Sequence, residues 1–245
     1  IRIAMPSESD LSKYKKIVPD IGEGHVYFDE ENHRYFDEQG NQMISGSRLE
    51  EMEVGPTDMT YPAEAMAKST GIPKQKILDI WSTNGDLSAA FGTVVHNAFE
   101  FYIKNMVEIQ HYDFVKERQH SATNWLPNTV GHIVDKYLRN VYDLVNSRSE
   151  VFVRYGKYCG YIDHLIMTGE NDVDLRDFKI INSIKKVKTK SYGTITKYSV
   201  QAPLYASILE ANGYNVNSIT LDTYNGEDWE AVKIDKVNIN VKEDA

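Results

Sequence analysis

The chain has 245 residues, of which 41% are hydrophobic and 26% are charged, and its formal net charge is −9. This length supports a substantial hydrophobic core in one large domain or two small ones. Cys159 is the single cysteine, which excludes an internal disulfide, a cysteine zinc site and a cysteine-ligated iron–sulfur cluster. No apolar run approaches the roughly 20 residues that a transmembrane helix needs, and the first residues lack the apolar stretch of a signal peptide. We therefore expect an intracellular protein without a membrane partner.

The first half of the chain is predicted to hold short strands followed by helices. Three short strands are expected between turns, at 25–29, 33–37 and 42–45. Helical patterns indicate four helices, at 60–70, 74–84, 86–107 and 128–147. Gly71 and Pro73 separate the first two helices, and the polar stretch 112–125 is expected to be a loop.

The second half is richer in strands. Strands are expected at 149–155, 158–167, 173–180, 217–224 and 229–234, with a helix at 195–212. The order of helices, strands, a helix and strands predicts one α/β (α+β) core with an N-terminal elaboration. We place the elaboration at 1–84 and the core at 85–235, within a single domain that spans 1–245.

The strands expected at 158–167 and 173–180 should form a hairpin, and two carboxylates and a lysine share one face of it. We expect Met167 to pair with Val173. Antiparallel pairing then sets Asp163 opposite Asp177, with their Cβ atoms roughly 5 Å apart. Lys179 lies two residues beyond Asp177 and therefore shares its face. Because like charges across a ladder destabilise a sheet, a divalent cation is the simplest group that would offset the repulsion.

The long helix predicted over 86–107 carries a histidine and a glutamate on one face. His96 and Glu100 are four residues apart in sequence, which separates them by about 6 Å along the helix axis. Neighbouring apolar residues would bury most of this helix, and a polar pair on a buried helix needs partners. Taken alone, this spacing more often marks a surface pair, or a core histidine satisfied by a carboxylate. The His-Glu-x-x-His pattern of zinc proteases is absent.

A second polar pair lies on the helix predicted over 195–212. Gln201 and Tyr205 share a face of that helix by the same spacing. An ordinary amphipathic helix with a polar rim accounts for the pair taken by itself. Pro203 removes one backbone hydrogen bond, and a kink there would aim Gln201 inward.

In their order along the chain, these motifs resemble those of a nuclease family. The series is Gly92-Thr93-x-x-His96-x-x-x-Glu100, Gly160-x-x-Asp163, Asp177-Phe178-Lys179 and Gln201-x-x-x-Tyr205. It resembles the PD-(D/E)XK nuclease superfamily, in particular its RecB-like branch of phage exonucleases and the mitochondrial genome maintenance exonuclease. His33-x-Tyr35 and Ser45-Gly46-Ser47 resemble a segment that often precedes the core, although Ser-Val-Thr is common where this chain has Ser45-Gly46-Ser47.

The resemblance implies a fold and a set of residue roles. The fold is a restriction-endonuclease-like core, with a central mixed sheet flanked by helices. The ligands of a catalytic Mg²⁺ or Mn²⁺ would be His96, Asp163, Asp177 and the backbone carbonyl of Phe178. The catalytic residues would be Lys179, Asp177, Asp163, Glu100 and Gln201, with Lys179 orienting or activating the attacking water. Tyr205 would help to position Lys179 and the substrate phosphate, and Glu150 is a further acidic candidate.

A cluster of lysines follows the hairpin. Within thirteen residues the chain has Lys185, Lys186, Lys188, Lys190 and Lys197. A solvated surface explains such a run as readily as DNA contact does, and the net charge of −9 argues mildly against strong non-specific DNA binding. Its place beside the carboxylates favours contacts with DNA phosphates, and tyrosines such as Tyr205 would stack on bases.

The sequence thus predicts a deoxyribonuclease that depends on Mg²⁺ or Mn²⁺ and has no iron–sulfur cluster. The resemblance implies an exonuclease, phage-encoded or cellular, that leaves 5′-phosphate and 3′-hydroxyl ends. Single-stranded DNA or duplex ends would be its substrate in recombination, repair or replication, with a recombinase or single-strand-binding protein as a further partner. The compartment would be a bacterial cytoplasm, a phage host or an organelle.

Two alternatives stand beside the nuclease. The first is a DNA-binding scaffold that keeps the nuclease fold without turnover. Such relatives usually lack an acidic residue or the lysine, whereas Asp163, Asp177 and Lys179 are all present here. The second is a metal-dependent hydrolase of another substrate, or a protein whose acidic hairpin holds only a structural ion.

Overall fold

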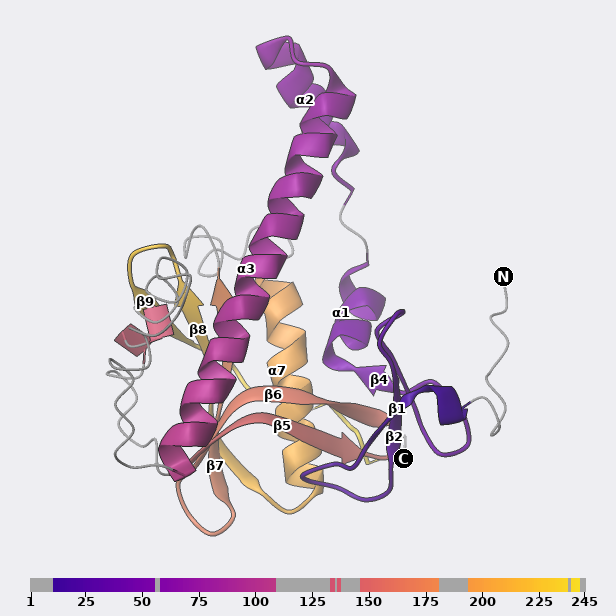
Figure 1. Ribbon diagram of the computed structural model, residues 1–245, viewed down its shortest axis with the longest axis vertical. Coiled ribbons are helices and arrows are strands. Elements are labelled where there is room, and N and C mark those ends of the chain that lie inside the picture. The colour runs from indigo at the N-terminus through magenta and orange to yellow at the C-terminus, as the bar shows by residue number, and fades with distance from the viewer. Residues whose placement is uncertain are drawn as a thin grey trace, which may run out of the picture.

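The computed structural model describes residues 11–55, 58–108, 133–134, 136–137, 146–180, 194–237 and 239–242. A six-stranded mixed sheet forms the centre of the molecule, and helices cover it (Figure 1). The expected mixed sheet flanked by helices is therefore confirmed. Among the described residues, no helix has both the length and the apolar character that crossing a bilayer would require.

The central sheet combines strands from both halves of the chain. It consists of β4 (Ile44–Ser45), β5 (Ser147–Tyr155), β6 (Tyr158–Met167), β7 (Asp172–Ile180), β8 (Asn215–Tyr224) and β9 (Trp229–Lys233). The order is β4-β6-β7-β8-β9, and β5 also pairs with β6. β4 runs parallel to β6 and β7 parallel to β8, whereas the remaining neighbours are antiparallel.

One edge of β6 is divided between two partners. β5 pairs along one edge of β6 from Tyr158 to Ile166. On the other edge, β4 pairs with Tyr158 and Cys159, and β7 pairs only from His164 onward. Residues 160–163 of β6 therefore lie in a gap between β4 and β7. Since Met167 pairs with Val173 as expected, this gap opens where the ladder would next have reached Asp163.

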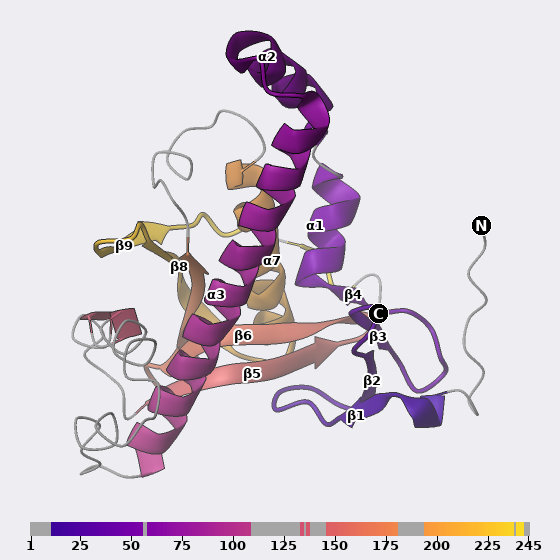
Figure 2. The same ribbon diagram turned by 45° about the horizontal axis from the view of Figure 1, so that its top comes forward.

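Two long helices cover the two faces of the sheet. α7 (Thr194–Ala211) packs its apolar residues on a core that includes Leu165, Leu175 and Val216. α3 (Lys74–Glu108) packs on the opposite face, where Phe99 stacks on Phe178 with ring centroids 4.2 Å apart. The first half of α3 and the short α2 (Thr60–Thr70) project away from the sheet (Figures 1 and 2).

The helices depart from the sequence prediction at α3 and at α1. The two helices expected at 74–84 and 86–107 are one helix of 35 residues. Gly85, the residue between the two expected ranges, costs a helix about 1 kcal/mol but does not end it. α1 (Gly46–Val54) was not predicted, because its mostly polar residues show no apolar periodicity; the Ser45 side chain caps it by accepting from the Arg48 N–H.

Other expectations fall at the edge of the described chain. The helix expected at 128–147 is helical at the described residues 133–134 and 136–137, but its end is wrong because β5 begins at Ser147. The loop expected at 112–125 lies outside the described residues. The domain division expected at residue 84 falls inside α3, while β4 and α1 join the central sheet and α7.

A second, antiparallel sheet comes from the N-terminal part. It consists of β1 (Lys15–Ile17), β2 (Val26–Asp29) and β3 (Arg34–Phe36), and a short 3₁₀ turn at Leu11–Lys13 precedes it. Its buried side chains pack with Met43 on Phe152 and Cys159 of the central sheet. β1 was not predicted, since three residues carry too little pattern to show in a sequence.

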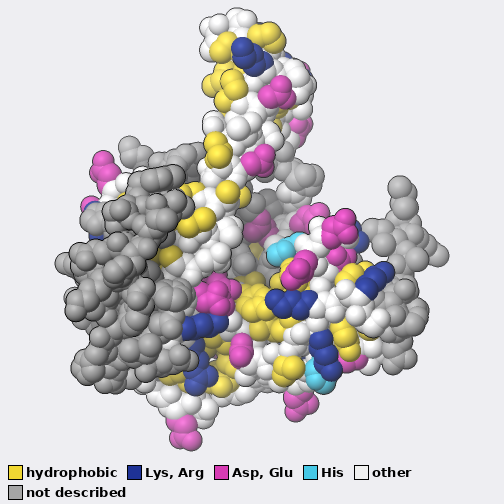
Figure 3. Space-filling model, in the orientation of Figure 1, with side chains coloured by type: hydrophobic (Ala, Val, Ile, Leu, Met, Phe, Trp, Pro, Cys, Tyr) yellow, Lys and Arg dark blue, Asp and Glu magenta, His cyan; other side chains and the backbone are white. Residues whose placement is uncertain are grey.

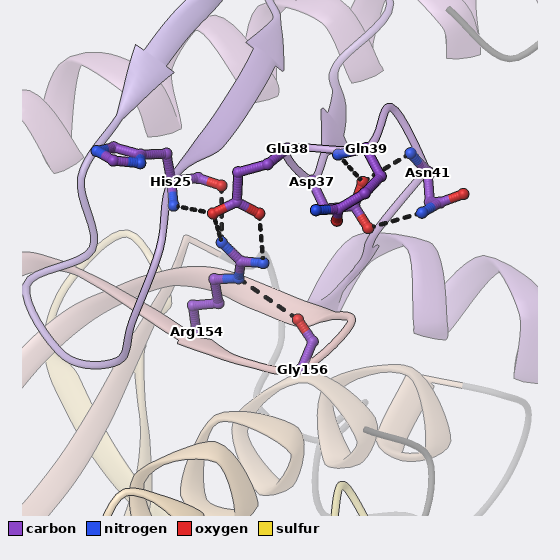
Figure 4. A network of polar contacts seen from close by, with 7 residues as sticks. All are labelled: His25, Asp37, Glu38, Gln39, Asn41, Arg154 and Gly156. Carbon is purple, nitrogen blue, oxygen red and sulfur yellow. Dashed lines mark hydrogen bonds and ion pairs between the residues drawn. The ribbon is translucent and has the colours of Figure 1, made fainter. Parts of the chain in front are cut away.

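An ion pair fastens this small sheet to the β5–β6 hairpin. Both guanidinium nitrogens Nη1 and Nη2 of Arg154 donate to the Glu38 carboxylate at 2.9 Å, and Nη1 also donates to the His25 carbonyl at 2.7 Å (Figure 4). The Arg154 side chain is only 12% exposed. Its hydrogen bond holds the pKa of Glu38 down at about 2, against an ordinary value of 4.5. Such bidentate pairs are stronger than a single surface contact.

We predict that Glu38→Gln lowers stability at neutral pH, and by less at pH 3. The ionised Glu38 stabilises the fold fully above its ordinary pKa, and this contribution disappears as the pH falls from 4.5 towards about 2. Discounted for partial exposure, the loss at pH 7 should be about 1 kcal/mol. Urea unfolding of both proteins at pH 7 and pH 3 measures it, with the exposed Glu23→Gln as control. A difference that grows in acid would contradict this account.

Candidate metal centre

The gap on β6 is held open at Asp163. Instead of continuing the ladder, the Asp163 carboxylate accepts the backbone N–H of Phe178 through Oδ2 at 2.8 Å. The Ser149 hydroxyl on β5 donates to the Asp163 carbonyl at 3.0 Å. The aspartate therefore bridges β5, β6 and β7 at the point where β6 and β7 separate.

Side-chain alternation reverses in both β5 and β6 at the same point. His164 and Ser147 are hydrogen-bonded to each other at 2.7 Å, and His164 faces Tyr137 on the side of the sheet that carries α3. Val151 and Ile162 instead join the core beneath α7, although strict alternation would place them with Ser147 and His164. The reversal falls on Glu150 and Asp163, and Glu150 has a φ of 51°.

This reversal gathers three metal-ligating side chains. Ligand atoms of His96, Glu150 and Asp163 all lie within 4.8 Å of one another. Nδ1 of His96 lies 3.5 Å from Oδ1 of Asp163, and the imidazole ring packs edge-on against Phe178. The three residues come from α3, β5 and β6, so residues more than fifty positions apart in sequence converge here.

Asp177 and Lys179 lie beside this cluster on β7. Asp177 is 5% exposed, and Oδ2 of its carboxylate lies 2.9 Å from Nζ of Lys179. Among the described residues, His96, Glu150 and Asp163 are the group whose ligand atoms lie within 4.8 Å of one another, and Asp177 is outside it. Its carboxyl is nonetheless close enough to Asp163 for the charge of Asp163 to affect its pKa. Lys179 lines the same cavity as His96 and Asp163.

The acidic groups ionise unequally. Burial raises the pKa of Glu150 to about 7, and the negative charge of Asp163 adds to the rise. Burial likewise raises the pKa of Asp177 to about 6, although Lys179 opposes the rise. Burial would raise the pKa of Asp163 too, but the hydrogen bond and charge of His96 outweigh it and hold that pKa at about 2. Three crowded carboxyls with one firmly ionised member are an arrangement that a cation would relieve.

Glu100 lies in the same cavity but has a different partner. Its carboxylate forms an ion pair with Lys104, one turn further along α3, and its side chain is 37% exposed. Glu100 is not one of the three clustered residues. The carboxylate that joins His96 and Asp163 there is that of Glu150. The helical spacing correctly placed His96 and Glu100 on one cavity-facing side, but only the fold determines which carboxylate reaches the histidine.

Tyr205 and Gln201 stand on the other side of the gap. The Gln201 amide donates to the Tyr205 hydroxyl at 3.2 Å, and both residues line the cavity. Tyr205 is only 4% exposed and fits against two glycines: a Cβ at Gly160 would lie 2.5 Å from its ring, and a Cβ at Gly46 would lie 2.6 Å from its hydroxyl. Stacking of a base on Tyr205, expected from the sequence, is therefore wrong, because the ring is already enclosed.

The cavity at the centre has a volume of about 590 Å³. Besides the residues above, its walls include Ser45, Ser47, Gly92, Thr93 and Asn97. Figure 3 shows this face hollowed below the projecting helices, with acidic side chains gathered around the hollow. Lys185, Lys186, Lys188 and Lys190, predicted to contact DNA, lie outside the described residues, as does the side chain of Lys197.

A buried polar network adjoins the centre. Arg176 donates two hydrogen bonds to Asp222, both at 2.7 Å, and the Tyr137 hydroxyl donates to the same carboxylate at 3.0 Å. The Tyr137 hydroxyl also lies 2.9 Å from Nδ1 of His164. Burial lowers the pKa of His164 to about 3, so this imidazole is neutral. Because His164 and Arg176 each adjoin an acidic residue of the centre, the network fixes the backbone that carries Asp163 and Asp177.

Comparison with known proteins adds little to this picture. No protein-family model matches the chain, and a search among curated proteins finds no match. A solved structure described as "Crystal structure of SSO0001" is similar at a TM-score of 0.31 and 16% identity, over 59% of this chain and 83% of that chain. A likeness at this level identifies neither a fold nor a function.

We predict that Gly160→Ala destabilises the protein by about 1–3 kcal/mol, because the new methyl group would meet the enclosed Tyr205 ring. Gly92→Ala is the matched control: nothing lies within 4 Å of a Cβ there, so alanine should stabilise α3 by about 0.5–1 kcal/mol. Urea unfolding of the two variants and the parent protein gives both values. Equal stability of Gly160→Ala and the parent would show that Tyr205 is not held against β6.

Proposed function

We propose that this chain is a metal-dependent phosphodiesterase that cleaves DNA. The observation that carries the proposal is the convergence of His96, Glu150 and Asp163 in one cavity, with Lys179 on its wall. Carboxylate oxygens, one imidazole and a nearby ammonium are the groups that phosphodiester hydrolysis requires. The resemblance of the sequence motifs to RecB-like nucleases supports the same reading.

The donor set suits a small hard cation. Two carboxylates and one imidazole lie close enough to bind one ion, and Asp177 stands next to Asp163 to complete the set. Oxygen ligands favour Mg²⁺, while the imidazole shifts the preference towards Mn²⁺. His96, Glu150, Asp163 and Asp177 would hold the ion, which when bound supplies positive charge at the phosphate and lowers the pKa of a water.

The remaining residues bind and orient. Lys179, which lies 2.9 Å from Asp177, would donate to a phosphate oxygen or to the attacking water. The Gln201 amide faces the same cavity from α7, and its bond to the buried Tyr205 hydroxyl fixes its position. Small side chains on α3, at Gly92 and Thr93, leave room for a polynucleotide backbone above His96.

We expect Asp163→Asn and Lys179→Ala each to reduce the rate of DNA cleavage by at least about 10²-fold, the effect of losing one group that acts on the reacting phosphate. Cleavage of end-labelled single- and double-stranded DNA in Mn²⁺ measures the rates. Asp86→Asn, an exposed carboxylate on α3, is the matched control and should cut at the parent rate. Retained cleavage in either site variant counts against the proposal.

Metal dependence gives an independent test. EDTA should stop cleavage, and added Mn²⁺ should restore it at least as well as Mg²⁺. Calorimetric titration with Mn²⁺ should show a site in the parent protein that weakens about 10-fold or more in Glu150→Gln, because one carboxylate ligand is lost. Activity that survives chelation would mean that the three converging side chains do not serve a metal.

A further inference from the structure

A second hollow opens beside the metal centre. It has a volume of about 470 Å³ and lies between the N-terminal sheet and the central sheet. Glu100, Glu150 and Tyr161 line both this hollow and the cavity of the metal centre. The two spaces therefore adjoin, and Tyr161 stands between them only two residues before Asp163 on β6.

Half of the residues that line this second hollow are apolar or aromatic. They include Ile17, Val18, Phe28, Phe152 and Tyr161. Val18 is 66% exposed, although the β1 residue next to it, Ile17, is buried. Tyr161 is held edge-on against the buried Phe152, with ring centroids 4.7 Å apart. A fixed aromatic ring and an exposed apolar side chain at one opening form a surface that a flat apolar group would cover.

Charge at the rim determines which part of a nucleotide fits there. The carboxylates of Asp20, Glu100 and Glu150 face this space, with the ammonium groups of Lys15 and Lys104. Lys104 is paired with Glu100, and Lys15 lies 3.9 Å from Glu30 outside the hollow. Because both lysines are paired in this way, neither ammonium group is left to bind a phosphate here, whereas an uncharged base gains from the contact of its ring with Tyr161.

We infer that this hollow is a nucleobase subsite. It takes the base of a nucleotide that adjoins the phosphate at the metal centre, with Tyr161 and Val18 as its contacts. The inference rests on the proposed function and narrows its substrate: a base can enter the hollow only when it is unpaired and unstacked, so the strand is single-stranded at the point of cleavage.

The test combines a missing base with two variants. A single-stranded oligonucleotide with one abasic residue is incubated with the parent protein in Mn²⁺, and the cleavage rate is mapped at every bond. The parent should cut a bond beside the abasic residue about 10-fold more slowly than the same bond in the intact strand, since one stacked base is lost. Tyr161→Leu and Val18→Ser should cut both strands at that bond equally.

Matched controls separate binding from folding. Tyr61→Leu changes a tyrosine that is 79% exposed on α2, a helix that lines neither the hollow nor the cavity of the metal centre, and should discriminate like the parent. Val18→Ser alters an exposed side chain, so it tests the subsite even where Tyr161→Leu is unstable. Equal cutting of abasic and intact strands by the parent, or unchanged discrimination in folded Val18→Ser, overturns the subsite and leaves the nuclease proposal standing. No cleavage of any strand by the parent overturns both.

Discussion

The centre depends on one local constraint, the reversal of side-chain alternation at Glu150 and Asp163. In a regular hairpin these two strands would keep each side chain on one face throughout. Here the strands turn over together, and Glu150 adopts a φ of 51°. A non-glycine residue in that region costs about 1–3 kcal/mol, and such strain persists only where its surroundings impose it. This backbone strain accompanies the convergence of two carboxyls, from neighbouring strands, on one histidine.

The surroundings that impose this geometry are polar and buried. On the side of the sheet that carries α3, the network of Arg176, Asp222, Tyr137 and His164 is closed by hydrogen bonds on every member. A satisfied network in a region of low dielectric constant is rigid, because each broken bond would leave a buried group unpaired. On the side that carries α7, Tyr205 fills the space left by Gly46 and Gly160 and limits movement of the gap. The acidic centre is thus held between a polar support and a packed aromatic ring.

Much of this arrangement was predictable from patterns along the chain. β6 was predicted with its observed bounds, and the expected pairing of Met167 with Val173 is present. Helical spacing put His96 on the correct side of α3. The sequence could not reveal the conformation of Glu150, because a glutamate within a strand pattern gives no sign that its backbone is left-handed. For the same reason Glu100, four residues from His96, was favoured over Glu150, although Glu150 lies beside the histidine in space.

Packing across long sequence separations was equally hidden. Gly46 departed from the Ser-Val-Thr expected there, and the positions of Gln201 and Tyr205 explain why a side chain is not accommodated. The continuity of α3 was missed because Gly85 and the polar residues around it suggest a break, whereas the buried Phe99 and Val95 further along hold the helix to the sheet. Tertiary contacts here outweigh a local preference of about 1 kcal/mol.

The unbroken α3 has a mechanical consequence. A helix of 35 residues is a stiff rod about 50 Å long, and His96 sits well inside it while its first turns stand clear of the sheet. Phe99 stacks on Phe178 one turn along α3 from His96, so the contact that fastens this long helix to the sheet also sets where the imidazole stands beside Asp163.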